Sequence, residues 1–204
     1  MARNIANRMT VFRLLASPIV VFLFWLAVPP HPADLIGSIN PWLLFAANWI
    51  LFFADVTDML DGWVARKYGE VSDFGKLVDP LADKIIHLGG YICLMYAGLA
   101  GLWVVIILLY RELVVGTLRV MAGKHGVVVQ ARISGKLKTL AQATALNWLF
   151  LFIFIKYFWH PFPLRTVAEI LNIIVVTITL YSGWDYYRAI TRLIRRSGWG
   201  EDLS

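Results

Sequence analysis

Long apolar runs recur along this chain and constrain its fold more than any other feature of the sequence. Several of them approach the roughly 20 consecutive apolar residues that cross a bilayer as a helix. Charged residues make up only 16% of the chain, whereas a soluble domain carries about a quarter. The sequence therefore predicts an all-α integral membrane protein, rather than a soluble domain with a very large core.

Six membrane spans are expected, and prolines, glycines or polar segments separate them. They cover residues 11–28, 41–53, 76–96, 102–120, 137–158 and 167–187. The first run is too long for the apolar part of a signal peptide, so we interpret it as a retained span. The basic segment Met1 to Thr10 before it is expected to lie on the membrane surface as a short interfacial segment. One domain, residues 1–204, accounts for the whole chain.

Basic residues are distributed unevenly between the two ends of these spans. Of the 19 Lys and Arg residues, all but Lys156 and Arg165 fall at the termini, in the second and fourth connections, or at the span ends beside them. The positive-inside rule then places both termini and these connections in the cytoplasm. Because the basic residues sit at span ends, the net charge of +6 points to anionic headgroups rather than to nucleic acid.

Four aspartates gather where the second span ends and the third begins. Asp58 and Asp61 are three residues apart, and Asp79 and Asp83 are four apart, so each pair lies on one helix face. If the two helices run antiparallel, the four carboxylates face each other near the cytoplasmic surface. So much negative charge near hydrocarbon requires either neutral acids or bound cations. Hard divalent ions with oxygen ligands fit this composition.

Simpler interpretations apply to some of the neighbouring residues. Aspartates near helix ends often act as caps or solvated charges; Asp73 fits the first role, and Asp55 needs to do no more than solvate the end of its helix. Arg66 is either a phosphate ligand or a cytoplasmic anchor. The single cysteine, Cys93, allows no disulfide framework and no thiolate metal site. The pairing of four aspartates on adjacent helices nevertheless favours a metal site.

The fixed spacing of these residues resembles a known family signature. The segment reads Asp58-x2-Asp61-Gly62-x2-Ala65-Arg66-x8-Gly75-x3-Asp79-x3-Asp83. It is similar, at all eight fixed positions, to the signature of the CDP-alcohol phosphotransferase family. That resemblance implies transfer of a substituted phosphate from a CDP-linked donor to an alcohol with release of CMP, two Mg²⁺ or Mn²⁺ ions, and a homodimer.

The resemblance also implies roles for individual residues within the signature, 58–83. Asp58, Asp61, Asp79 and Asp83 would be metal ligands, and Asp83 would in addition take the proton from the acceptor hydroxyl as the catalytic base. Five positions would line the CDP site: Gly62, Ala65, Arg66, Ser72 and Gly75. Close packing of the two helices is a second explanation for the small residues among them.

A second informative segment covers residues 111–142. Arg111 lies at a depth where a charge should face the interior of the bundle, and Glu112 is expected to orient it by pairing. Arg111, Arg119, Lys136 and Lys138 would together form a basic pocket for an acceptor that carries its own phosphate. The alternative is that the basic residues of this segment only follow the positive-inside rule and bind no ligand. This interpretation applies best to Lys124 and Arg132.

This second segment is similar to the corresponding segment of one branch of the family, the bacterial phosphatidylglycerophosphate synthases. The sequence Thr57-Asp58-Met-Leu-Asp61-Gly62 is also similar to theirs. The implied substrates are CDP-diacylglycerol and sn-glycerol 3-phosphate. The implied localisation is the bacterial inner (cytoplasmic) membrane. The protein would be multi-pass and in contact with membrane lipids, and its active site would face the cytoplasm.

Two other hypotheses remain open at this point. Another branch of the family would accept inositol phosphate, inositol, serine or phosphatidylglycerol. A basic pocket favours a phosphorylated acceptor, which disfavours the neutral ones but not inositol phosphate. A divalent-cation transporter would also carry intramembrane aspartates, although all four lie at one cytoplasmic mouth. A non-catalytic scaffold would not need such buried charges.

Overall fold

The structure is a computed structural model that describes the backbone of residues 2–28, 39–68, 73–124 and 132–197. It describes the side chains of residues 12–28, 39–57, 81, 84–123 and 132–193. Within these ranges the regular structure is entirely helical, which confirms the all-α prediction.

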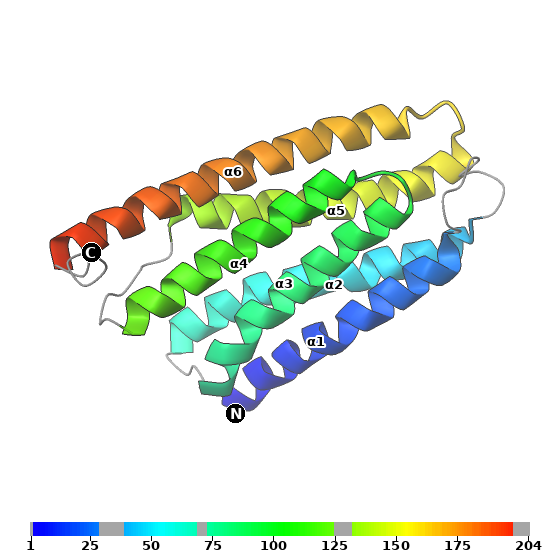
Figure 1. The fold of residues 1–204 in the computed structure, drawn as a ribbon. Coiled ribbons are helices and arrows are strands. Elements are labelled where there is room, and N and C mark those ends of the chain that lie inside the picture. The colour runs from blue at the N-terminus through cyan, green and yellow to red at the C-terminus, as the bar shows by residue number, and fades with distance from the viewer. Residues whose placement is uncertain (1, 29–38, 69–72, 125–131, 198–204) are drawn as a thin grey trace.

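Six helices run alternately up and down in one bundle (Figure 1). Their bounds are α1 Ala2–Ala27, α2 Pro41–Tyr68, α3 Asp73–Tyr96, α4 Leu102–Lys124, α5 Ile133–Phe158 and α6 Leu164–Ser197. Two segments, Ile133–Phe158 and Leu164–Leu193, are by length and composition apolar enough to cross a membrane, and Phe12–Ala27 and Pro41–Thr57 are shorter apolar helices. Six spans and their orientation stay predictions.

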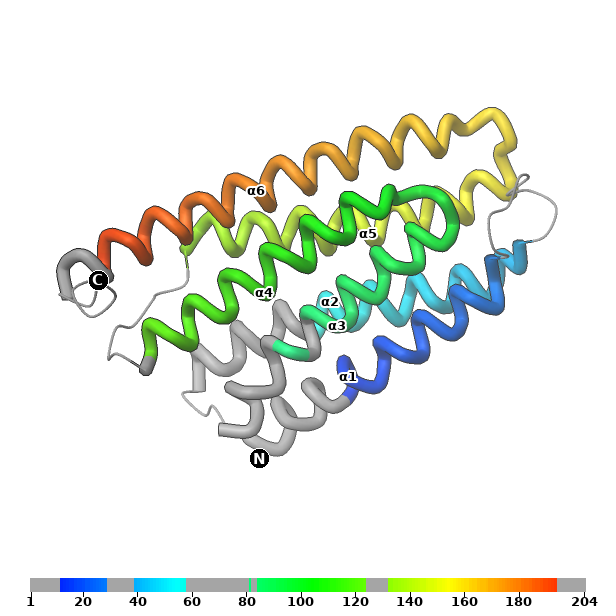
Figure 2. Tube along the Cα trace, in the orientation of Figure 1, coloured from blue at the N-terminus to red at the C-terminus, as the bar shows by residue number. Residues whose placement is uncertain are grey.

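Prolines and glycines were expected at the boundaries of the spans, and Pro41 and Gly98 do mark helix ends. Pro41 begins α2, where its missing N–H costs nothing, and the side-chain oxygen of Asn40 accepts hydrogen bonds from the backbone N–H groups of Trp42 (3.2 Å) and Leu43 (3.3 Å). After α3, Gly98 adopts a left-handed φ of 71°. The N–H of Leu99 then reaches the carbonyl of Leu94 at 2.8 Å, which is the Schellman arrangement that ends a helix. Figure 2 shows the short turn that follows into α4.

The N-terminal segment differs from the prediction. The chain has no separate interfacial helix over residues 2–10, because α1 is continuous from Ala2 to Ala27. No glycine or proline stands between Ala2 and Ser17, so nothing in the backbone interrupts the helix there. A drop in hydrophobicity marks where a membrane would end, but it does not by itself end a helix.

The hydrophobic core holds the helices of the bundle together. Helix α1 packs on α2 and α3, α5 packs on α2 and α6, and α4 packs on α3 and α6. The rings of Phe24 in α1 and Phe150 in α5 lie 4.8 Å apart, and both side chains are buried. At Gly90 of α3, an added Cβ would meet the side chain of Leu146 of α5 at 2.5 Å, so the glycine lets this leucine pack directly against the backbone of α3. This packing brings α2, α3, α4 and α5 around one pocket.

Candidate functional site

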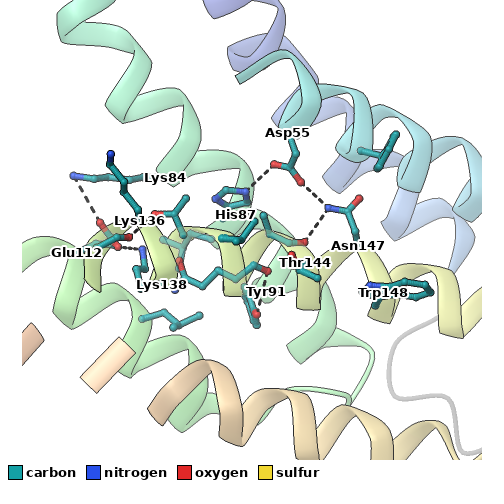
Figure 3. Close-up of a pocket in the computed structure, with 18 of the residues that line it drawn as sticks. Asp55, Lys84, His87, Tyr91, Glu112, Lys136, Lys138, Thr144, Asn147 and Trp148 are labelled. Atoms are coloured by element: carbon teal, nitrogen blue, oxygen red, sulfur yellow. Dashed lines mark hydrogen bonds and ion pairs between the residues drawn. The ribbon is translucent and has the colours of Figure 1, made fainter. Parts of the chain in front are cut away.

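A pocket of about 970 Å³ lies between α2, α3, α4 and α5, with Tyr186 of α6 at its edge. Its lining changes along its length (Figure 3). We call its three parts the aromatic end (Phe45, Trp49, Phe52, Trp148, Leu151), the polar middle (Asp55, His87, Asn147) and the basic end (Lys84, Arg111, Glu112, Arg119, Lys136, Lys138). A molecule that fills the pocket would meet apolar groups at one end and cations at the other.

Glu112 organises the basic end. Its carboxylate accepts a hydrogen bond from Arg111 Nη1 at 3.0 Å and a close one from the ammonium of Lys138, and Lys84 Nζ lies 3.9 Å away. The pairing of Arg111 with Glu112 that we expected is thus confirmed. Arg111 also donates to Ser182 Oγ at 2.7 Å. Because the carboxylate fixes these cations without neutralising all of them, the basic end remains attractive to an anion.

Tyr186 is a residue that we missed from the sequence. Its ring lies 4.6 Å from the guanidinium carbon of Arg119 and 5.5 Å from that of Arg111. Its hydroxyl accepts a hydrogen bond from Arg119 and another, at 3.0 Å, from the backbone N–H of Arg132. An added Cβ at Gly135 would lie 3.0 Å from this hydroxyl oxygen. A tyrosine near a span end is usually an interface anchor, and only the fold shows that this one is buried beneath two arginines.

Asp185, next to this tyrosine, fixes the beginning of α5 on α6. Its carboxylate accepts hydrogen bonds from Arg132 Nε and Ser134 Oγ, both at 2.6 Å. Arg132, which we expected to be a surface charge, therefore has a defined partner. The contact sets where the first turn of α5 lies, and with it the positions of Lys136 and Lys138.

The four basic residues predicted for the acceptor all line this one pocket. Lys138 is buried and held by Glu112, whereas Lys136 is exposed. The structure thus brings Arg111, Arg119, Lys136 and Lys138 together at the basic end. Their contact with an acceptor phosphate stays a prediction.

The contacts of Asp55 in the polar middle show that the expected role of this residue was wrong. Its side chain does not simply solvate a helix end: Oδ1 accepts a hydrogen bond from His87 Nε2 at 2.8 Å, and Oδ2 accepts one from the amide of Asn147 at 2.6 Å. The side chains of Asp55 and His87 are only 19% and 12% exposed. Sequence spacing held a signal for this pair, because Asp55 comes three residues before Asp58 and His87 comes four after Asp83.

The signature residues themselves fall where side chains are not described. Asp58, Asp61, Gly62, Ala65 and Arg66 belong to the last turns of α2, and Gly75, Asp79 and Asp83 to the first turns of α3. Ser72 lies outside the described residues altogether. The predicted metal and CDP contacts therefore stay predictions. The Asp55–His87 contact supports them, because helix residues three or four apart share a face and α2 and α3 already touch through that face one turn away.

Comparisons with known protein families and with individual relatives point to the same family of enzymes. The family model described as CDP-alcohol phosphatidyltransferase matches residues 3–187. The chain is 35% identical over 190 residues to a protein of Bacillus subtilis (strain 168) named CDP-diacylglycerol–glycerol-3-phosphate 3-phosphatidyltransferase, with 90% of this chain and 93% of the relative covered. It is 32% identical over 197 residues to a protein of Mycobacterium tuberculosis (strain ATCC 25618 / H37Rv) named probable phosphatidylglycerophosphate synthase, with 96% and 84% covered.

Proposed function

Because the chain belongs to the CDP-alcohol phosphatidyltransferase family, we propose that it transfers the phosphatidyl group from CDP-diacylglycerol to sn-glycerol 3-phosphate, giving phosphatidylglycerophosphate and CMP. Relatives that match most of the chain carry the name of this reaction. The observation that carries the proposal is the pocket, in which an aromatic end and a basic end meet at the helices of the signature. Such a pocket suits one lipid substrate and one phosphorylated soluble substrate.

The two ends of the pocket divide the substrates between them. The acyl chains of the donor lie along the aromatic end, where Trp49, Phe52 and Trp148 are exposed on α2 and α5. The phosphate of the acceptor lies at the basic end, where arginine forks and ammonium groups bind its oxygens. The CDP moiety lies against Gly62, Ala65, Arg66, Ser72 and Gly75, as the family resemblance implies.

The four signature aspartates would hold the divalent ions, Mg²⁺ or Mn²⁺ and two in number. Their all-oxygen donor set fits hard cations, and the contact between Asp55 of α2 and His87 of α3 supports a facing arrangement of Asp58 and Asp61 with Asp79 and Asp83. When bound, such ions offset the charge of the diphosphate and polarise its phosphorus.

Asp83 acts on the acceptor. Its carboxylate takes the proton from the primary hydroxyl of glycerol 3-phosphate while that oxygen forms a bond to the phosphorus that carries diacylglycerol. The bond from this phosphorus to the oxygen of CMP breaks, CMP leaves with the electron pair, and the proton passes from Asp83 to the surrounding water. Because a carboxylate is a weak base for an alcohol, proton transfer accompanies bond formation rather than preceding it.

In the membrane, the six helices of the single domain 1–204 are six spans with both termini in the cytoplasm. The protein is then multi-pass in the bacterial inner membrane, in contact with lipids, and forms a homodimer. Figure 1 supports this orientation: α2, α4 and α6 end, and α3 and α5 begin, at one end of the bundle. Most of the basic residues belong to that end, so the active site faces the cytoplasm.

Assays with different acceptors test the assignment. Purified protein with CDP-diacylglycerol and Mn²⁺ should release CMP when glycerol 3-phosphate is added, and much less with inositol phosphate, inositol, serine or phosphatidylglycerol. Transfer to inositol phosphate alone would place the chain in another branch of the family. Uptake of divalent ions into vesicles without any CDP-dependent chemistry would instead favour a transporter.

Arg119→Ala should raise the KM for glycerol 3-phosphate by about 10- to 100-fold, the range expected for a lost charge-assisted hydrogen bond. The KM for CDP-diacylglycerol should change much less, because Arg119 lies at the basic end. Steady-state CMP release with each substrate varied in turn measures both constants. Arg192→Ala, which removes an exposed arginine of α6 outside the pocket lining, is the matched control. A larger rise for the donor would place Arg119 in the donor site.

A further inference from the structure

Asp55 joins three helices at the polar middle of the pocket (Figure 3). It extends from α2 and accepts hydrogen bonds from His87 of α3 at 2.8 Å and from Asn147 of α5 at 2.6 Å. Each of its two oxygens has a different helix as its partner. The carboxylate is therefore a fixed link between α2 and α3 and, separately, between α2 and α5.

The α2–α3 link lies directly beside the signature in the chain. Asp55 is three residues before Asp58 and His87 is four after Asp83. At a rise of about 1.5 Å per residue these separations are about 4.5 Å and 6 Å along the helix axes, or roughly one turn each. A rotation or shift of α3 against α2 that broke the link would move the two pairs of aspartates relative to each other.

The second link joins α2 to α5. Asn147 also donates to the carbonyl of Ala143 within α5 at 2.9 Å, so its amide has a defined direction. Lys138 lies on the same continuous helix. The Asp55–Asn147 bond therefore sets how α5 stands against α2, and so where its lysines lie relative to the signature.

A carboxylate among apolar helices is unfavourable unless its oxygens have hydrogen-bond partners. Asp55 is less than a fifth exposed, and its neighbours on α2 include the buried Ala54 and Leu51. A residue that only packed against other helices would not need a charge here. The cost of burying the charge is offset by two directional bonds, which fix orientation in a way that apolar contacts do not.

We propose that Asp55 is a positioning residue with two separable roles: through His87 it holds α2 and α3 in the register that the metal aspartates need, and through Asn147 it holds α5 so that the acceptor lysines face them. This rests on the proposed function for the acceptor half. Asp55 itself touches neither substrate nor metal in this assignment. The two links lead to different measurable effects.

His87→Leu removes the first link and should weaken Mn²⁺ binding by about tenfold. This is the size of effect expected when a residue that supports metal ligands without touching the metal is replaced. The KM for glycerol 3-phosphate should stay unchanged. His87→Gln, whose amide can still donate to Asp55, should restore most of the binding. Electron paramagnetic resonance of free Mn²⁺, titrated with the purified full-length protein in detergent, measures binding without any turnover.

Asn147→Leu removes the second link at nearly constant side-chain size. It should raise the KM for glycerol 3-phosphate by about tenfold, the lower end of the effect of one hydrogen bond to a charged group, and leave Mn²⁺ binding unchanged. Asp55→Ala breaks both links and should shift both quantities. Thr177→Val, which removes a side-chain hydrogen bond to the carbonyl of Ile173 on the exposed face of α6, should shift neither.

Thermal unfolding in detergent shows that each variant is folded before it is compared. If His87→Leu and Asn147→Leu alter Mn²⁺ binding and acceptor KM in parallel, or alter neither, Asp55 has no separable positioning roles and the inference is wrong. A wild-type protein that binds Mn²⁺ but releases no CMP with glycerol 3-phosphate would contradict the proposed function instead. The effect of His87→Leu on Mn²⁺ binding would still test the α2–α3 link in that case.

Discussion

Asp83→Asn is expected to lower kcat by about 10²- to 10⁴-fold, the usual contribution of a positioned general base, while the protein still binds Mn²⁺ and CDP-diacylglycerol. The amide keeps the size of the side chain and one oxygen donor, but it cannot take the proton of the acceptor hydroxyl. Rapid measurement of CMP release, together with equilibrium binding of Mn²⁺ and of the CDP-lipid, separates the two effects.

Asp73→Asn is the matched control for this substitution. It changes an acidic residue at the first position of α3, which is not one of the fixed positions of the signature, and it should leave kcat nearly unchanged. If Asp83→Asn reduced Mn²⁺ binding as strongly as turnover, Asp83 would be mainly a ligand. The base would then have to be sought elsewhere in the pocket.

Removal of divalent ions should abolish CMP release altogether, and added Mg²⁺ or Mn²⁺ should restore it. In the proposed arrangement, the four aspartates would repel one another without cations and would also repel the diphosphate of the donor. Activity after dialysis against a chelator and after stepwise return of each metal tests this expectation. Thermal unfolding on the same samples should show a lower Tm without metal, because binding to the folded state stabilises it.

Asp58→Asn should raise the Mn²⁺ concentration needed for both activity and thermal stabilisation, because it removes the charge of one of the four proposed ligands. Glu169→Gln changes an exposed acidic residue of α6 that lies outside the pocket lining and serves as the control. Full activity in the presence of a chelator would contradict the metal site, and with it the role of all four aspartates.

The sequence predicted six helices and several of their ends, because local chemistry determines those points, although α2 and α6 continue past the predicted spans to Tyr68 and Ser197. Pro41 and Asn40 begin α2, and Gly98 ends α3 through a backbone conformation that other residues rarely adopt. The continuity of α1 was not predicted, since a change from apolar to polar residues was mistaken for a break in the helix. Polarity reports on the environment of a helix, whereas capping side chains and residues such as proline and glycine set where it begins and ends.

Side-chain partners from distant parts of the chain were harder to predict. Glu112 was correctly paired with Arg111, its neighbour in sequence. The partners of Asp55 stand 32 and 92 residues away, and Arg119 lies 67 residues from Tyr186. Periodicity shows which face of a helix a residue occupies, but the neighbour of that face depends on how all six helices pack. The signature was found from its fixed spacing alone, and its side-chain geometry stays a prediction.

The carboxylate of Glu112 gives the basic end of the pocket a negative charge of its own. An incoming anion must therefore compete with a carboxylate that already holds Arg111 and Lys138. A phosphate dianion offers several oxygens and can satisfy both cations at once, whereas chloride has a single charge and no directional pair of acceptors. For the proposed phosphate acceptor, selection over small ions such as chloride would thus follow from a residue whose charge opposes that of the ligand.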